Sequence, residues 1–184
     1  MRCHSLPPIA SRDAWVLVLG TMPGRVSLRE RQYYAHPQNA FWKIAAEIFG
    51  FDASSDYSAR VASLEVHGVA VWDVLKSCTR ASSLDSDIDM STIVPNDFKR
   101  FFARQPRIRR VCFNGAKAAA LYLRHVQPHL REALALEHVR LPSTSPANAS
   151  ISRAEKLREW RAIERPKQLR GEPCGHASIP CSRF

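Results

Sequence analysis

Apolar residues gather in four short runs along the chain, and each run is rich in the aliphatic, β-branched and aromatic residues that buried strands favour. The runs are Trp15–Leu19, Val69–Trp72, Ile108–Phe113 and Leu136–Leu141. Other stretches place apolar residues three and four positions apart, which is the spacing of a helix that buries one face. The clearest of these helical stretches are Phe41–Phe49, which Gly50 ends, Ala116–Val126 and Ile151–Ile163.

Alternating strands and helices predict an α/β sandwich, in which helices cover a mostly parallel sheet. A chain of 184 residues suits one such domain, which we place at residues 12–163. Residues 1–11 are expected to be an N-terminal extension. From residue 164 onward the apolar periodicity fades into Pro, Gly, Ser and basic residues. Residues 164–184 are therefore expected to form a basic, disordered tail.

Composition narrows the classes of protein that the chain can be. Hydrophobic residues make up 45% of it and charged residues 24%, as in ordinary globular domains. No uncharged stretch approaches the ~18 apolar residues of a membrane-spanning helix, and no apolar segment follows Arg2 as it would in a secretory signal. The five cysteines include no CxxC pair, which favours reduced thiols over disulfides or a metal site. We therefore expect a cytoplasmic protein that needs no metal and no cofactor.

The charge is strongly basic and comes mainly from arginine. Lys and Arg together number 27 against 17 Asp and Glu, and the sequence holds 21 Arg but only 6 Lys. Guanidinium groups bind phosphate with two parallel hydrogen bonds, so this excess suits a polyanionic partner such as nucleic acid. A bias in the base composition of the genome would give the same excess. The charge permits nucleic-acid binding without establishing it.

Small and polar residues follow each of the four predicted strands. In open α/β sheets ligands bind beyond the carboxyl ends of the strands, so these residues are expected to share one edge with a ligand. The first strand is followed by Gly20, Thr21, Met22, Pro23 and Gly24, the second by Asp73, the third by Asn114 and Gly115, and the fourth by residues 142–148. The first group lacks the spacing of a dinucleotide or P-loop motif, and taken alone it is a turn.

The segment Tyr33–Trp42, with the sequence YYAHPQNAFW, places aromatic rings, an imidazole and a primary amide just before a predicted helix. Asn39 stands where a helix often takes its N-cap, and aromatic residues beside it often enter the core. From the residues alone, capping and core packing explain the segment as well as a binding role does.

Several segments taken together resemble the hypoxanthine-DNA glycosylase branch of the uracil-DNA glycosylase superfamily. They are GTMPG at residues 20–24, YYAHPQNAFW at 33–42, WDVL at 72–75, SSLDSDI at 82–88, FNGAKAA at 113–119 and LPSTSPANA at 141–149. The AHPxNxFW part is also similar to the mismatch-specific uracil glycosylases. The resemblance spans roughly residues 12–163 and keeps the motifs in order. It implies a three-layer α/β/α sandwich around a central, mostly parallel four-stranded sheet.

The resemblance implies a DNA-repair enzyme that acts on DNA containing deaminated bases, in double strands and also in single strands. Such an enzyme flips the damaged base out of the helix, hydrolyses its N-glycosidic bond and leaves an abasic site without cutting the strand. No lysine stands in a motif position, so no Schiff-base nucleophile is evident and the enzyme is expected to be monofunctional. We expect it to act as a monomer in base excision repair.

The resemblance also assigns roles to single residues. Tyr34 matches a ring that stacks on the flipped base, with a core aromatic as the alternative. Asn114 matches a residue that reads the base edge, because an amide both donates and accepts, and capping the next helix is its alternative. Groups that could hold the departing base are the first loop, with Thr21, Met22, Pro23 and Gly24, and also His36 and Asn114.

Catalysis is where the sequence departs from the superfamily pattern. Met22 holds the place at which many members carry an Asp or Asn that positions the attacking water, and a thioether cannot activate water. The resemblance to the hypoxanthine branch implies that the amide of Asn39 substitutes for it by orienting water toward C1′. The loop after the fourth strand resembles the motif that enters the DNA, and its expected DNA contacts are Ser143, Ser145, Pro146, Ala147 and Asn148, with Arg153 adding a phosphate contact.

Three other interpretations stay open. A uracil-directed or mismatch-directed glycosylase of the same fold is one, since uracil and hypoxanthine both place a carbonyl beside an N–H. A DNA-binding relative that has lost catalysis is another, and the missing group at Met22 motivates it. An α/β enzyme acting on free nucleotides is the third, and it leaves the resemblance of residues 143–149 unexplained.

Overall fold

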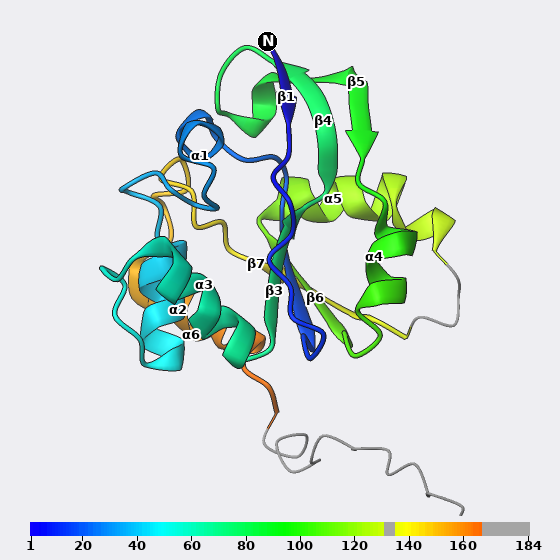
Figure 1. The fold of residues 1–184 in the computed structure, drawn as a ribbon. Coiled ribbons are helices and arrows are strands. Elements are labelled where there is room, and N and C mark those ends of the chain that lie inside the picture. Colours follow the sequence, from blue (N-terminus) through cyan, green and yellow to red (C-terminus); the bar gives the residue numbers. More distant parts are fainter. Residues whose placement is uncertain (131–134, 167–184) are drawn as a thin grey trace, which may run out of the picture.

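The four predicted strands form one parallel sheet at the centre of the computed structural model, which describes residues 1–130 and 135–166 (Figure 1). The strand order is β3-β2-β6-β7. The strands are β2 (Val16–Gly20), β3 (Val69–Asp73), β6 (Arg110–Asn114) and β7 (Glu137–Leu141). All neighbours run parallel, with Gly20 beside Asp73 and Asn114 beside Leu141. The carboxyl ends of the strands therefore meet at one edge, as the sequence predicted.

Helices cover both faces of this sheet, so the predicted three-layer sandwich is confirmed. Helices α2, α3 and α6 lie on one side, and α4 and α5 lie on the other (Figure 1). The helices in chain order are α1 (Arg25–Glu30), α2 (Phe41–Phe49), α3 (Tyr57–Val66), α4 (Phe98–Arg104), α5 (Ala116–His125) and α6 (Arg153–Trp160). Short 3₁₀ turns are η1 (Asp85–Asp87), η2 (Gln127–His129) and η3 (Arg161–Ile163). The sequence did not predict α1, α3 or α4.

A second, antiparallel sheet was not predicted from the sequence. It has the order β1-β4-β5 and is built from β1 (Arg2–His4), β4 (Leu75–Arg80) and β5 (Ile88–Pro95). Residues 1–11 were expected to extend from the domain, but β1 pairs with β4 and Ile9 bridges Val71 of the central sheet. Cys3 and Ile9 are buried, so this segment is part of the domain. Of the expected tail, residues 167–184 lie outside the described residues.

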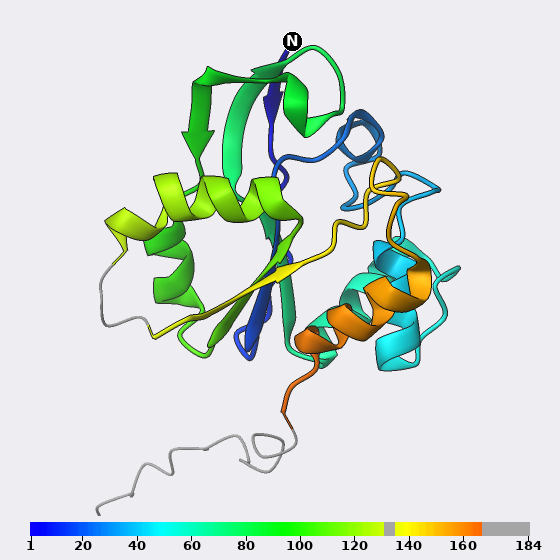
Figure 2. The same ribbon diagram turned by 180° about the vertical axis from the view of Figure 1, so that it is seen from behind.

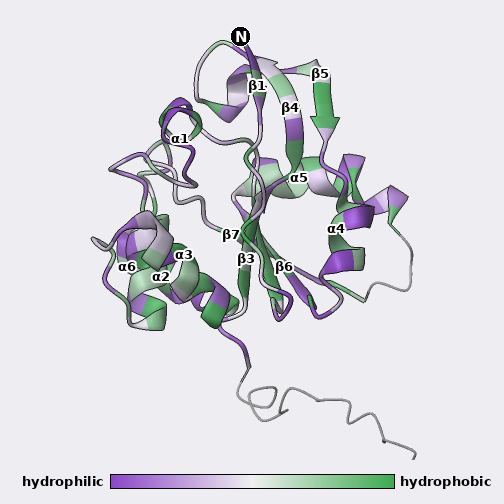
Figure 3. Cartoon of the chain, in the orientation of Figure 1, coloured by the Kyte–Doolittle hydropathy of each residue, from purple (hydrophilic) through white to green (hydrophobic). Residues whose placement is uncertain are grey.

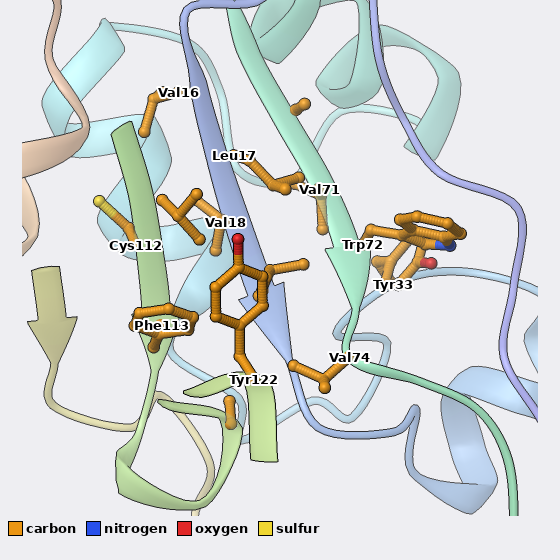
Figure 4. Close-up of a cluster of buried hydrophobic side chains, with 14 of the residues drawn as sticks. Val16, Leu17, Val18, Tyr33, Val71, Trp72, Val74, Cys112, Phe113 and Tyr122 are labelled. Carbon is orange, nitrogen blue, oxygen red and sulfur yellow. The ribbon is translucent and has the colours of Figure 1, made fainter. Parts of the chain in front are cut away.

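The core lies on both sides of strand β2, whose residues are all buried (Figure 4). On one side, Phe113 and Tyr122 pack with their ring centroids 5.1 Å apart, which joins β6 to α5. On the other side Phe41 meets Trp160 edge to face at 5.7 Å, joining α2 to α6. Edge-to-face aromatic pairs of this kind add stability beyond the area they bury. Hydrophobic colouring accordingly concentrates in the strands and on the inner sides of the helices (Figure 3).

Helix ends follow ordinary capping chemistry. Helix α2 ends at Gly50 in the left-handed region, with φ of 74°, as the sequence predicted. Helix α6 begins with a capping box, in which Ser152 and Glu155 each accept a hydrogen bond from the other's backbone N–H. In the part of the chain that the structure describes, none of the helices combines the length and the apolar character that a membrane crossing requires.

Gly68 and Gly50 make a matched pair for testing the packing of the sheet edge, because both have a positive φ, of 71° and 74°. A Cβ on Gly68 would lie 2.9 Å from Cδ1 of Trp15, whereas a Cβ on Gly50 would meet nothing within 4 Å. Both alanine variants should lose roughly 1–2 kcal/mol of unfolding free energy from backbone strain. Gly68→Ala should lose about a further 1–3 kcal/mol from the clash, as measured by urea denaturation. Equal losses in the two variants would contradict this packing.

Candidate active site

A cavity of about 980 Å³ opens at the carboxyl edge of the parallel sheet. Its wall is built from the loops that follow β2, β4, β6 and β7, from the end of β3 at Asp73, from the segment before α2 and from part of α6. Seen from behind, the loop between β7 and α6 lies beside the loop that leads toward α2 (Figure 2). The structure brings nearly all the predicted site residues to this cavity: Thr21, Met22, Pro23, Gly24, Tyr34, His36, Asn39, Asn114, Ser143, Ser145, Pro146, Ala147 and Asn148.

Arg153 is the predicted site residue that the cavity wall does not include. It lies in the first turn of α6, and its guanidinium pairs with Glu47 of α2 at 2.5 Å. Both side chains are well exposed, so this ion pair contributes little to stability. Other arginines reach the cavity, namely Arg25, Arg140 and Arg158. These three are basic groups that the sequence analysis did not assign to the site.

The loop after β2 is a fixed part of the wall rather than a plain turn. Thr21, Met22 and Pro23 are buried. The backbone carbonyls of Gly20 and Thr21 accept hydrogen bonds from Val74 N–H and Leu75 N–H at 2.8 and 3.1 Å. Arg80, itself buried, donates to the carbonyl of Pro23 from behind the loop. Hydrogen bonds from Val74, Leu75 and Arg80 therefore hold the loop along its length.

Tyr34 lies in the wall with an unusual backbone conformation, φ of 55° in the left-handed region. One face of its ring packs on Phe41, with the centroids 4.1 Å apart. Burial, and next the Asp73 carboxylate, raise the pKa of its hydroxyl. A backbone strained in this way persists only where the surroundings hold it, and such residues gather at binding sites. Tyr34 therefore packs on the core through one face of its ring and also lines the cavity, so each interpretation accounts for one of its contacts.

Asn39 directly precedes Ala40, the N-cap residue of α2, so the expectation that Asn39 is the cap is wrong, although its side chain binds the first residue of the helix. Its Oδ1 accepts a hydrogen bond from the Phe41 N–H at 3.0 Å, and its backbone N–H donates to the carbonyl of His36 at 2.8 Å. The side chain is half-buried and lines the cavity. An amide oxygen has two lone pairs and the NH₂ group two donors, so this contact leaves hydrogen-bonding capacity on Asn39. His36 lines the cavity from an exposed position.

Asn114 uses both ends of its amide to hold Thr144. Its Oδ1 accepts from the Thr144 N–H and its Nδ2 donates to the Thr144 hydroxyl, both at 2.8 Å. Thr144 is buried, and its carbonyl accepts from the Ala40 N–H at 3.0 Å. The expectation that Asn114 could cap α5 is wrong, because Gly115 is the N-cap residue and no side chain caps that end. Both ends of the amide instead bind the loop after β7 and fix its position.

The loop after β7 is fixed at both ends and exposed in the middle. Trp160 donates from Nε1 to the Pro142 carbonyl at 2.9 Å, and Lys156 donates to the Asn148 carbonyl at 2.6 Å. Between these anchors, Pro146 and Ala147 are exposed. A rigid loop with a small, compact tip can enter another molecule without first having to become ordered.

Two carboxyl groups also lie in the wall: Asp73, which the sequence placed at the expected ligand edge without a role, and Asp85, to which the sequence assigned no role. Burial is the main cause that raises the pKa of both, and it raises that of Asp73 to about 7. Asp85 accepts a hydrogen bond from the Thr21 hydroxyl at 2.7 Å, and Asp73 accepts one from the Ser5 hydroxyl at 2.9 Å. Carboxyls with strongly perturbed pKa values in a cavity are candidates for acid–base chemistry. The sequence signal that could have identified Asp73 is a polar residue directly after a run of buried strand residues.

Comparison with known proteins agrees with this geometry. The family model for the uracil DNA glycosylase superfamily matches residues 7–165. A hypoxanthine DNA glycosylase of Methanosarcina acetivorans is 33% identical over 163 residues, covering 88% of this chain and 98% of that protein. A hypoxanthine DNA glycosylase of Methanosarcina barkeri is 34% identical over 166 residues, covering 90% and 100%.

Among solved structures, the chain is similar to the solution NMR structure of a candidate uracil DNA glycosylase from Methanosarcina acetivorans. The TM-score is 0.73 at 29% sequence identity, with 89% of this chain and 99% of that chain covered. The family-model match at residues 7–165 includes all of the residues that line the cavity. The chain belongs to the uracil DNA glycosylase superfamily.

Proposed function

We propose that this protein is a monofunctional DNA glycosylase that releases hypoxanthine from deoxyinosine in DNA. The observation that carries the proposal is a single cavity at the carboxyl edge of the sheet, which gathers the motif loops after β2, β6 and β7 and the segment before α2. Full-length similarity of 33–34% to two hypoxanthine DNA glycosylases supports the same substrate. A cavity of about 980 Å³ has room for a purine and the sugar attached to it.

In this proposal the base is flipped into the cavity beside Tyr34, whose ring already packs on Phe41. Asn39 orients the attacking water toward C1′ with the hydrogen-bonding capacity that the Phe41 N–H leaves free. Met22 is buried in the loop after β2 and offers a thioether, which cannot activate water. Glycosidic cleavage passes through a cation-like sugar, so a weak group that positions water can suffice if the departing base is stabilised.

DNA would be held across the mouth of the cavity. Pro146 and Ala147, at the exposed tip of the loop after β7, fill the space that the base vacates, while Ser143, Ser145 and Asn148 contact phosphates or the unpaired partner base. Arg25, Arg140, Arg158 and Arg153 add phosphate contacts. No lysine lines the cavity among the described residues, which supports a reaction without a Schiff base. We propose that the protein acts as a monomer in the cytoplasm, on double-stranded and on single-stranded DNA.

The test of the function uses end-labelled duplexes that carry one deoxyinosine, one deoxyuridine or no lesion, treated with alkali after incubation so that each abasic site becomes a strand break. Wild-type protein should cleave the deoxyinosine strand. Asn39→Ala should lower the rate roughly 100-fold or more, the order seen when one group that acts in the transition state is removed. Gln38→Ala, an exposed neighbour outside the cavity wall, should keep the wild-type rate.

Asn39→Ser separates catalysis from the contact with the Phe41 N–H in the same assay. A serine oxygen still accepts the Phe41 N–H, so the variant should keep the wild-type melting temperature, but it is too short to place water and should stay inactive. An active Asn39→Ser or Asn39→Ala variant would leave Asn39 with only the structural role of binding the Phe41 N–H. Release of uracil alone would move the protein to the sister activity of the superfamily, and release of neither base would favour a DNA-binding relative without catalysis.

The two hydrogen bonds between Asn114 and Thr144 predict that their loss lowers both the stability of the protein and its rate of hypoxanthine release. Asn114→Ala leaves the buried Thr144 N–H and hydroxyl without partners and should lower the unfolding free energy by about 1–3 kcal/mol. It should also lower the rate of hypoxanthine release, because the loop after β7 loses its anchor. Thr144→Ser keeps both hydrogen bonds and serves as the control, with a small loss. Denaturation curves that show no difference between the two variants would disprove this anchoring.

A further inference from the structure

Asp73 is the last residue of β3, and the proposed function has so far given it no task. It lines the cavity although only 3% of its surface is exposed to solvent. In the register of the sheet it pairs with Gly20 of β2, the residue that begins the first motif loop. A carboxyl group buried in the wall of a catalytic cavity is costly unless it is neutral or paired, so its state needs an explanation.

The carboxyl group of Asp73 lies against Gly20, the first residue of the motif loop at residues 20–24. Its Oδ2 accepts the Ser5 hydroxyl at 2.9 Å, and its backbone carbonyl accepts Nδ2 of Asn96 at 2.8 Å. An ideal Cβ on Gly20 would lie 2.6 Å from Oδ1 of Asp73 and 3.4 Å from the hydroxyl oxygen of Tyr34. The absence of a side chain at Gly20 is therefore what allows this oxygen to reach the wall beside Tyr34.

The groups that face Asp73 come from several elements and shift its pKa in both directions, and burial outweighs the groups that favour the ionised form. Burial is the largest cause, and together with Asp85 of η1 it raises the pKa to about 7. The hydroxyls of Ser5 and Tyr33 and the guanidinium of Arg80 in β4 lower it. Among the described residues no salt bridge reaches Asp73, and Arg80 donates to the carbonyl of Pro23 instead. At neutral pH a large share of the molecules therefore carry a proton on Asp73.

A group of this kind would speed the reaction of the proposed function. Hypoxanthine leaves with the electron pair of the glycosidic bond, and a proton on the purine makes it a better leaving group. The other polar groups considered for this task are poorly suited to supply a proton. Asn114 holds Thr144 with both ends of its amide, an amide is not an acid at neutral pH, and His36 lies in an exposed part of the rim.

We propose that Asp73 enters the reaction as a neutral carboxylic acid and gives its proton to the purine as the C1′–N9 bond breaks. This rests on the proposed function. The pair of electrons of the C1′–N9 bond goes to the purine, and the proton from Asp73 goes to the purine with it, so that neutral hypoxanthine departs. The oxygen of the water that Asn39 orients bonds to C1′, and a proton from that water passes to the Asp73 carboxylate, directly or through solvent. Deoxyinosine in DNA and water thus give hypoxanthine and an abasic site.

The experiment is a pH profile of hypoxanthine release under single-turnover conditions, with enzyme in excess, between pH 5.5 and 9. The wild-type rate should be level below about pH 7 and fall up to tenfold per pH unit above it, because the acid form of Asp73 is lost. Asp73→Asn cannot transfer a proton and should be roughly 100-fold slower at pH 6, without the falling limb. Asp89→Asn, an exposed carboxyl-to-amide change outside the cavity wall, should keep the wild-type profile.

Asp85→Asn gives a second variant that leaves Asp73 in place. The charge of Asp85 raises the pKa of Asp73, so its removal should move the falling limb of the profile to lower pH. A wild-type rate that stays level or rises between pH 6 and 9 overturns the proposal, as does an Asp73→Asn variant with the same fall. If the wild-type protein releases hypoxanthine but lacks the falling limb, only the role of Asp73 fails. Release at no pH overturns the proposed function together with this role.

The stability of the protein reports the same titration without any substrate. The pKa of Asp73 is raised on folding, so its contribution to stability is complete below the ordinary pKa of an aspartate and is lost as the pH rises through about 7. The melting temperature of Asp73→Asn relative to wild type should therefore increase between pH 4 and pH 8. A difference that does not change with pH would mean that Asp73 is ionised throughout, and this would overturn the proposal as well.

Discussion

The two hydrogen bonds between Asn114 and Thr144 connect the parts of the active site that come from distant regions of the sequence. Asn114 ends β6, Thr144 lies in the loop after β7, and the carbonyl of Thr144 receives the N–H of Ala40 at the start of α2. Asn39, the proposed water-positioning residue, directly precedes that N–H. A shift of the loop would thus move its exposed tip, which we propose enters the DNA, together with the amide of Asn39. One buried threonine therefore links the position of the tip to that of Asn39.

The second constraint comes from the carboxyl edge of the parallel sheet, which must make room for a buried carboxyl group. Gly20 and Asp73 are neighbours in register, and the missing side chain of the one makes room for the carboxyl group of the other. Burying that carboxyl among two tyrosines opposes folding once it ionises. The surrounding core, in which the residues of β2 and β3 are all buried, offsets this cost. The loss of stability occurs at the wall of the cavity, where an acid with a raised pKa is available to donate a proton.

Strands β2 and β3 could be predicted because strands buried on both faces are apolar throughout, and β6 is nearly so. Strand β7 is exposed along much of its length, and its sequence EHVRL carries the weakest of the four apolar runs. The small sheet could not be predicted, because β5 is exposed along most of its length and carries no continuous apolar run. Helix α3 has one buried residue, Leu64, so its periodicity is weak. Asp73 looked like an ordinary residue at a strand end. Its burial comes partly from Ser5, which is 68 positions away in the sequence and was assigned to an extension.

The motif residues were found by resemblance, and the proposed mechanism divides the chemical tasks among them. An amide such as Asn39 can hold water in place but cannot take its proton in the way a carboxylate can, and Met22 offers no help on that side. A reaction with so weak a group near the nucleophile must lower its barrier mainly at the leaving base. In the proposed mechanism Asp73, a buried acid with a pKa of about 7, performs that task. A first motif without a strong base and a neutral acid at the end of β3 then complement each other, in a mechanism suited to a purine that leaves more easily once protonated.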